Sequence, residues 1–196
     1  MNLALIGMRG VGKSNISRRL GFAAKRPVLS TDVLLHYETG QEIPDFVADH
    51  GWPAFREREF EIVTRIAALD QVIVDCGGGI IVDLDDDGTE IYSERCVAAL
   101  KTSGPVVWLR GDVDRLAAKT AGDPQRPALH DTRSAAEIMR RREPFYARAA
   151  DVIIDVEDRK RSRLARELAL QFADELGLDD ELRATLRGKL SERRAQ

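Results

Sequence analysis

The segment GMRGVGKS, residues 7–14, decides the fold class of this 196-residue chain. It satisfies the pattern G-x-x-x-x-G-K-[ST], in which a glycine-rich turn runs into Lys13 and a hydroxyl residue. The apolar run at residues 2–6 precedes the segment, and an amphipathic helical pattern over Ser14–Lys25 follows it. Because this pattern binds phosphates where strand, glycine loop and helix follow in this order, we predict a nucleoside triphosphate site here.

The residue types of this segment suit a bound triphosphate. Glycines let the backbone curl until several N–H groups point inward at one anion. Lys13 neutralises oxygens of the β- and γ-phosphates, and the Ser14 hydroxyl is placed to reach Mg²⁺. We therefore expect the loop to bind ATP through Gly7, Gly10, Val11, Gly12, Lys13, Ser14 and Asn15.

Short apolar runs alternate with helical patterns along the chain. The runs are continuously apolar, as in a parallel sheet covered on both faces, and lie at Leu3–Ile6, Pro27–Leu29, Val72–Val74, Val106–Leu109 and Val152–Ile154. The helical patterns between and after them include Ser14–Lys25, Trp52–Leu69, Glu90–Thr102, Ser134–Ala149 and a stripe of Leu164, Leu168 and Phe172. We predict an α/β fold of the P-loop NTPase type, a parallel β-sheet with helices on both faces.

Composition limits the classes of partner. The chain is 43% hydrophobic and 32% charged, and its net charge of −3 offers no general attraction to nucleic acid or an anionic membrane. It has no run of 18 apolar residues, no signal-peptide pattern at its start, and only Cys76 and Cys96 as cysteines. We therefore expect neither nucleic acid nor membrane as a partner, and a cytoplasmic location.

The motifs end well before the end of the chain. We expect one domain over residues 1–177 and a helical extension over 178–196, with leucines at 178, 182, 186 and 190. The extension packs on the domain, mediates a dimer or frays, and the sequence leaves these alternatives open. We expect a monomer, with a weak dimer through the extension as the alternative.

Five further stretches follow the phosphate loop in a fixed order. They are LSTDVLLHYETG (29–40), FREREFE (55–61), VDCGGG (74–79), QRPALHD (125–131) and RRREPFY (140–146). Together with the loop they resemble the shikimate kinase family, whose pattern reads D-T-D before T-G, then F-R-x-x-E, G-G-G, R-P-L-L and R-x-P-L-Y. The resemblance runs from about residue 1 to about residue 172.

The resemblance implies ATP-dependent phosphorylation of the 3-hydroxyl of shikimate, a step toward chorismate and the aromatic amino acids. Two arginines suit the carboxylate of such an acceptor, and Asp32 can accept a hydrogen bond from the attacking hydroxyl. The implied acceptor site comprises Asp32, Arg56, Gly77, Gly78, Gly79 and Arg142. The catalytic residues are then Lys13, Asp32 and Arg126, the last in a lid that also binds ATP. Lys119 stands where the family has an arginine against adenine, and an ammonium lacks the planar stacking.

One departure from the family pattern concerns the metal. The turn here reads Ser30-Thr31-Asp32, so the first aspartate, which in the family helps to hold Mg²⁺, is a serine. Another acid, Asp75, ends an apolar run, the usual place of the magnesium acid in other phosphate-loop proteins. We expect Ser14 and Asp75 to hold the metal; a local cap or ion pair is the alternative role of Asp75.

The stretch at residues 83–94 also matches the spacing of a calcium loop, with Asp83, Asp85, Asp87, Gly88 and Glu94 in place. A strand and three glycines precede it instead of a helix, and its eighth position is Glu90 instead of an apolar residue. We interpret it as a solvated acidic loop leading into the next helix.

Two other functions remain open at this point. One is a kinase of similar fold for quinate, gluconate or another small polyol. The other is a degenerate kinase that binds ligand and regulates a partner, which Ser30 favours and which Lys13, Ser14, Asp32 and Arg126 oppose.

Overall fold

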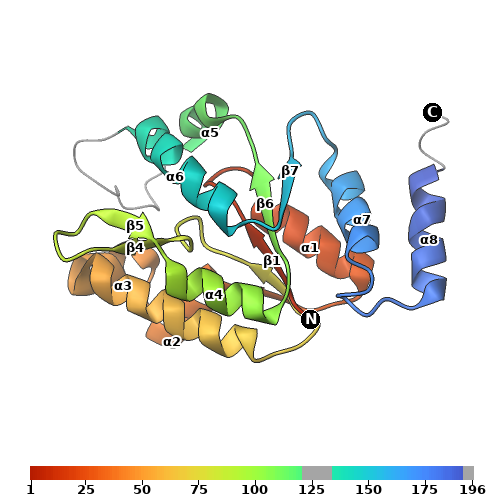
Figure 1. Cartoon of the computed structure of the whole chain (residues 1–196), viewed down its shortest axis with the longest axis horizontal. Helices are drawn as coiled ribbons and strands as arrows, with labels where there is room; N and C mark the ends of the chain where they lie inside the picture. Colours follow the sequence, from red (N-terminus) through yellow and green to blue (C-terminus); the bar gives the residue numbers. More distant parts are fainter. Residues whose placement is uncertain (121–133, 192–196) are drawn as a thin grey trace.

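Five parallel strands form the centre of the protein in a computed structural model that describes residues 1–120 and 134–191. Their order across the sheet is β2-β3-β1-β6-β7, and every neighbouring pair is parallel (Figure 1). The strands are β1 (Leu3–Ile6), β2 (Val28–Ser30), β3 (Ile73–Asp75), β6 (Val106–Arg110) and β7 (Val152–Asp155). The predicted α/β fold is confirmed, and each predicted strand is present within two residues of its expected bounds.

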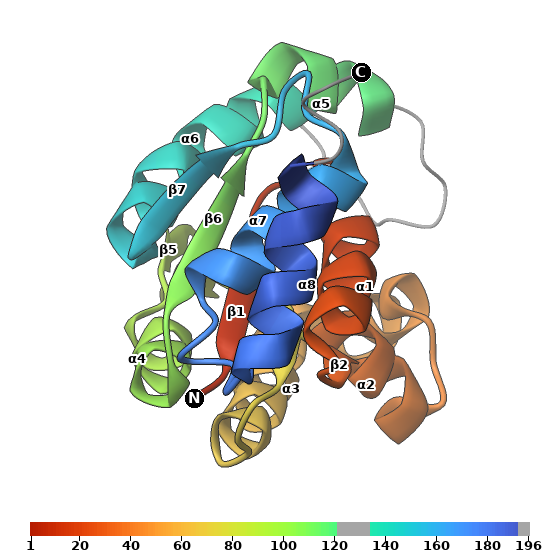
Figure 2. The same cartoon turned by 90° about the vertical axis from the view of Figure 1, so that its right-hand side faces the viewer.

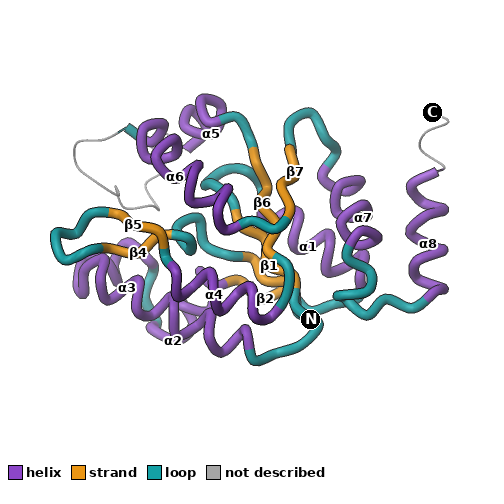
Figure 3. Tube along the Cα trace, viewed as in Figure 1, coloured by secondary structure: helices purple, strands orange, loops and turns teal. Residues whose placement is uncertain are grey.

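Helices cover both faces of this sheet (Figures 2 and 3). They are α1 (Lys13–Ala24), α2 (Thr31–Thr39), α3 (Ile43–Ala67), α4 (Glu94–Ser103), α5 (Val113–Thr120), α6 (Ala135–Ala149), α7 (Arg161–Gln171) and α8 (Asp180–Ser191). Helices α1 and α7 lie together over one face, and α4 and α6 lie over the other (Figure 2). All four residues of β1 are buried, because a central parallel strand is covered on both faces. In the part of the chain that the structure describes, none of the helices is both long and apolar enough to cross a membrane.

Helices α2 and α3 differ from the sequence prediction. The helix predicted from Trp52 is the second part of α3, which bends at Gly51, where φ is 81°. Helix α2 had no predicted counterpart; it begins where Ser30 accepts a hydrogen bond from the Val33 amide at 3.4 Å. Such a cap is a local signal for a helix start, and it brings Asp32 into the first turn.

The predicted acidic loop and the start of the helix after it need correction. Residues 82–92 form an antiparallel hairpin of β4 (Val82–Leu84) and β5 (Glu90–Tyr92), so the prediction of a helix from Glu90 is wrong. Helix α4 begins four residues later, where the Ser93 side chain caps it. Only the tip of the hairpin is a solvated acidic turn. Among the described residues, no group of three His, Cys, Asp or Glu side chains is arranged to hold a metal ion.

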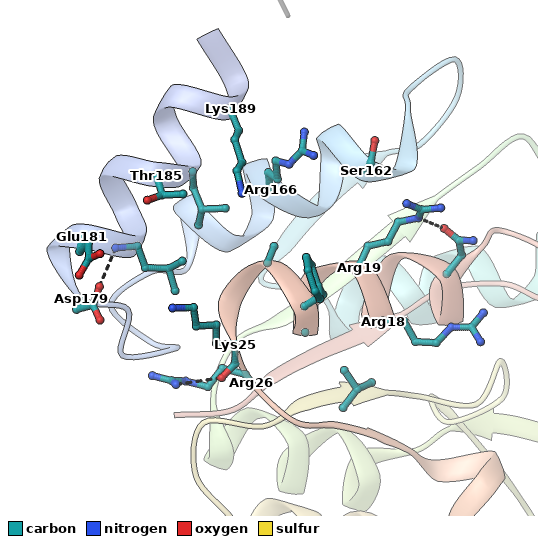
Figure 4. A pocket seen from close by; sticks show the side chains of 17 residues that line it. Arg18, Arg19, Lys25, Arg26, Ser162, Arg166, Asp179, Glu181, Thr185 and Lys189 are labelled. Atoms are coloured by element: carbon teal, nitrogen blue, oxygen red, sulfur yellow. Dashed lines mark hydrogen bonds between the residues drawn. The ribbon is translucent and has the colours of Figure 1, made fainter. Parts of the chain in front are cut away.

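Helix α8 packs against α7, away from the sheet. Leu186 of α8 is only 2% exposed, and Leu178, which precedes the first residue of α8, is 5% exposed. A cavity of about 1130 Å³ lies between α1, α7 and α8 (Figure 4). Cationic side chains line it, namely Arg18, Arg19, Lys25, Arg26, Arg166 and Lys189. The extension is therefore anchored on the fold through its leucines, while the division of the chain after Gly177 stays a prediction.

Truncation after Gly177 is expected to lower stability and to leave kcat within a few-fold of the full chain. Burying a leucine contributes about 1.5–3 kcal/mol, so losing Leu178 and Leu186 should lower Tm by about 6–24 °C. Thermal unfolding and steady-state kinetics at 25 °C check the two parts. A folded truncation without activity would contradict the prediction.

Candidate active site

The phosphate loop has the backbone that its glycines allow. Gly7 and Gly12 have φ of 154° and 98°, and a Cβ on Gly7 would lie 2.6 Å from the Leu109 carbonyl oxygen. Helix α1 begins at Lys13, directly after the loop, so its N-terminal amides are next to the curled backbone. The Lys13 ammonium donates hydrogen bonds to the carbonyls of Gly7 at 2.8 Å and Met8 at 3.2 Å. Amides, helix terminus and ammonium meet here, as an anion site requires.

The other predicted ATP-binding residues have varied surroundings. Gly10 (φ 78°) and the buried Val11 lie within the loop. The Asn15 side chain accepts a hydrogen bond from Arg19 at 2.7 Å, which leaves its backbone amide for the phosphates. Lys119, at the end of α5, donates to the Gly10 carbonyl at 2.8 Å, so it reaches the phosphate loop itself. The predicted lid arginine, Arg126, lies outside the described residues.

Asp75 ends β3 beside the phosphate-loop strand. In the register of the sheet it is level with Leu5 of β1 on one side and with Ser30 of β2 on the other. The side chain is buried, and its Oδ1 has no hydrogen-bond partner among the described residues. Burial raises the pKa of this carboxyl above its ordinary value, and the Ser14 hydroxyl and then the Lys13 ammonium offset part of that rise. A buried carboxylate oxygen without a donor, beside a hydroxyl, is suited to a cation or its bound water.

The first and third of the three glycines after β3 are in close contact with predicted acceptor residues. A Cβ on Gly77 would lie 2.4 Å from Asp32 Oδ1 and 3.0 Å from Glu59 Oε1. A Cβ on Gly79 would lie 2.6 Å from Nη2 of Arg56. A side chain at either position would have to displace charged groups of α2 and α3, which lie directly on the backbone.

The middle glycine connects this cluster to the nucleotide loop. A Cβ on Gly78 would lie 3.2 Å from Arg9 Cγ and 3.8 Å from the Gly7 carbonyl oxygen. The amide of Gly77 donates to the Thr31 hydroxyl at 2.8 Å, which ties the same turn to the start of α2. The glycine turn therefore lies between the phosphate loop and Asp32.

Both predicted carboxylate-binding arginines are buried and already paired. Arg56 is 5% exposed; it forms an ion pair with Glu59 and donates to the Gly79 carbonyl at 3.1 Å. Its Nε is buried without a partner. Arg142 is 4% exposed and forms an ion pair with Glu90 of β5. Each arginine thus has one protein carboxylate in contact.

Glu59 lies at the centre of the charges. Burial raises its pKa above the ordinary value; the nearby Arg56 charge lowers it, the Asp32 charge raises it, and Arg142 also lowers it. Since all three groups act on one carboxyl, Asp32, Arg56 and Arg142 surround a single small region.

Sequence reasoning missed three residues of this region. Glu59 follows Arg56 by three residues on a helix, a spacing that places both on one face, and the quoted motif contains it. Tyr146 likewise follows Arg142 by four residues on α6. For Glu90 no sequence signal existed, because its partner is 52 residues away.

Tyr146 holds the glycine turn from the side of α6. The side chain is fully buried, and its hydroxyl donates to the Gly78 carbonyl at 2.5 Å. Burial raises the pKa of this phenol, so it stays a donor.

Tyr146→Phe is expected to lower the free energy of unfolding by about 1–3 kcal/mol, because the Gly78 carbonyl loses its donor. Chemical denaturation measures this change, and the KM for the acceptor should rise a few-fold as the turn loosens. Tyr37→Phe, at a 77% exposed position, is the control and should change neither quantity. Unchanged stability in Tyr146→Phe would contradict the prediction.

A phosphate loop on a five-stranded parallel sheet, next to a second polar cluster, defines a phosphate-loop kinase for a small molecule. The sequence model of the family described as shikimate kinase matches residues 9–173. The chain belongs to the shikimate kinase family, and it is a kinase.

Named relatives agree with this membership. A shikimate kinase from Leptospira biflexa is 44% identical over 151 residues, covering 76% of this chain and 83% of the relative. One from Pseudomonas syringae pv. syringae is 30% identical over 176 residues, covering 88% and 96%. The solved shikimate kinase from Acinetobacter baumannii in complex with shikimate has a TM-score of 0.75 and 26% identity, covering 89% of this chain and 94% of the other. The Aquifex aeolicus enzyme, with a TM-score of 0.72 and 21% identity over 90% and 99%, shares the fold.

Proposed function

We propose that the protein transfers the γ-phosphoryl group of ATP to the 3-hydroxyl of shikimate, giving 3-phosphoshikimate on the route to chorismate and the aromatic amino acids. The observation that carries this proposal is the glycine turn, which touches the phosphate loop at Gly78, Asp32 at Gly77 and Arg56 at Gly79. Donor and acceptor groups thereby come within reach of each other. The solved relative that contains shikimate supports the choice of acceptor.

Each side chain has a role that its surroundings support. Lys13 moves from the loop carbonyls to the β- and γ-phosphate oxygens when ATP binds. Asp32, exposed in the first turn of α2, accepts a hydrogen bond from the attacking hydroxyl and takes its proton late. Arg56 and Arg142 bind the acceptor carboxylate through donors that Glu59 and Glu90 leave free.

Mg²⁺ is the metal that this chemistry implies, and the residues present fit it. Ser14 offers a hydroxyl and Asp75 a buried carboxylate oxygen without a donor, and a site of this kind completes its shell with phosphate and water. When bound, the ion neutralises charge on the transferring phosphoryl group. Asp75 then replaces the acid that the family carries at the position of Ser30, its neighbour across β2 and β3.

The remaining expectations stay predictions. Lys119 contacts the nucleotide near Gly10 without stacking on adenine, because its ammonium is compact and not planar. The protein acts in the cytoplasm as a monomer, without nucleic acid or membrane as a partner.

A coupled assay of ADP release with shikimate, quinate and gluconate tests the proposal. We expect ADP release with shikimate at a kcat/KM at least about tenfold above that with gluconate, since the acceptor groups match a ring carboxylate and its hydroxyls and gluconate is an open chain. Mass spectrometry identifies the product. A preference for gluconate would overturn the choice of acceptor. Binding of ATP and shikimate without ADP release would instead indicate a degenerate kinase that binds its ligands and regulates a partner.

A further inference from the structure

In the β4–β5 hairpin the charged residue Glu90 is buried, although an apolar residue stands next to it in the strand. Successive side chains of a strand point to opposite faces, and in β5 the charged Glu90 is 5% exposed while its apolar neighbour Ile91 is 42% exposed. An ordinary hairpin would bury the isoleucine instead. The register of the hairpin, with Leu84 opposite Glu90 and Val82 opposite Tyr92, therefore gives up apolar burial to place a carboxylate inside.

The hairpin lies beside α6 (Figure 1), and side-chain contacts near Glu90 join the two elements. Tyr92 lies edge-on to Phe145 with ring centroids 5.9 Å apart, and the Arg148 guanidinium lies 4.1 Å from the centre of the Tyr92 ring. Arg141 donates to the Glu90 carbonyl at 3.1 Å. These contacts fix β5 relative to α6, so the Glu90 side chain has a defined position beside Arg142.

Glu90 contacts one edge of the Arg142 guanidinium. Nε donates to Oε2 at 3.0 Å, and Nη2 donates to Oε1. The Nη1 group donates no hydrogen bond to any residue that the structure describes, and a guanidinium has five N–H donors in a planar fork. The edge formed by Nη1 and Nη2 therefore remains able to bind a second carboxylate.

A buried ion pair of this kind adds little net stability, because the desolvation of both charges offsets their attraction. It does fix orientation, since a two-point contact restricts a long side chain to one rotamer. Arg142 also lies close enough to Glu59 to lower its pKa, so the oriented guanidinium belongs to the same region as Arg56.

We infer that Glu90 is a positioning residue for Arg142: it holds one edge of the guanidinium so that the other edge receives the carboxylate of the acceptor. The inference rests on the proposed function. Glu90 itself makes no contact with the acceptor. The recognition site for the carboxylate then depends on a hairpin that lies outside the main sheet.

The test compares Glu90→Gln, Arg142→Met and the double variant in the full-length enzyme. Glutamine keeps the size of the glutamate, and methionine keeps an unbranched stem in place of the arginine. Glu90→Gln should raise the KM for shikimate about tenfold, leave the KM for ATP within twofold and change kcat little, because Arg142 loses the contact that orients it. In the Arg142→Met background the same replacement should raise the KM for shikimate no further. Glu94→Gln is the control, since Glu94 at the start of α4 also pairs with an arginine of α6, Arg148, but at the surface, and it should leave both KM values unchanged.

Three results would overturn the inference. A lower KM for shikimate in Glu90→Gln would mean that Glu90 competes with the acceptor for Arg142. A lower Tm with both KM values unchanged would mean that the pair only tethers the hairpin. An equal rise in the Arg142→Met background would mean that Glu90 acts through another group. Activity of the unmodified enzyme on shikimate tests the proposed function separately, so the two failures are distinguishable.

Discussion

Replacing Arg56 or Arg142 by alanine is expected to raise the KM for the acceptor about 30-fold, because each change removes about 2 kcal/mol of charge-assisted hydrogen bonding to its carboxylate. The KM for ATP should stay nearly unchanged, since neither arginine is part of the phosphate loop. Steady-state kinetics with each substrate varied in turn measures both constants.

The structure adds a second expected effect of these changes. Glu59 and Glu90 are 3% and 5% exposed, so removal of either arginine takes an ion-pair partner from a buried carboxylate. Breaking such a pair costs about 3–5 kcal/mol, and Tm should fall in both variants. Arg58→Ala is the matched control, since its pair with Glu61 on the same helix is exposed, and it should preserve both Tm and KM. An equal rise in the KM values for both substrates would show that the arginines support the fold or the nucleotide site instead.

Replacing Asp75 by asparagine should lower kcat at least tenfold, about 1.4 kcal/mol in the barrier, and raise the Mg²⁺ concentration needed for half-maximal activity. Asparagine keeps the size of the side chain but removes the charge that would hold the metal and its water. Asp32→Asn is the comparison: it should impair the acceptor step with little change in the dependence on Mg²⁺. Titration of Mg²⁺ at saturating substrates measures the difference.

The decisive form of this experiment exchanges the two neighbouring residues. Ser30 and Asp75 are directly level across β2 and β3, so an acid at either position reaches nearly the same place. Ser30→Asp combined with Asp75→Ser should recover activity over Asp75→Ser alone. The start of α2 should be preserved in this variant, because Ser30 caps the helix through the Val33 amide and aspartate can serve as a cap too. If Asp75→Asn matches the parent enzyme at limiting Mg²⁺, Asp75 is not the metal acid.

The acceptor cluster shows where inference from the sequence stopped. The F-R-x-x-E motif contains both Arg56 and Glu59, and helical spacing puts them on one face, so their pairing was within reach of the sequence. The three glycines were expected to belong to the acceptor site. The structure adds that Gly77 and Gly79 lie against Asp32, Glu59 and Arg56, contacts between segments that no local pattern encodes.

The sequence by itself determined the phosphate loop, the five parallel strands and the acidic end of β3, because each depends on residues within one short segment: glycines that permit positive φ, apolar runs, and a carboxylate after such a run. The tertiary structure alone decided that residues 82–92 form a hairpin, that Glu90 turns inward while Ile91 faces solvent, and that Glu90 meets Arg142 across 52 residues. The physical reason is that a buried charge is tolerated only where a distant opposite charge meets it, and that meeting depends on how the hairpin packs on α6.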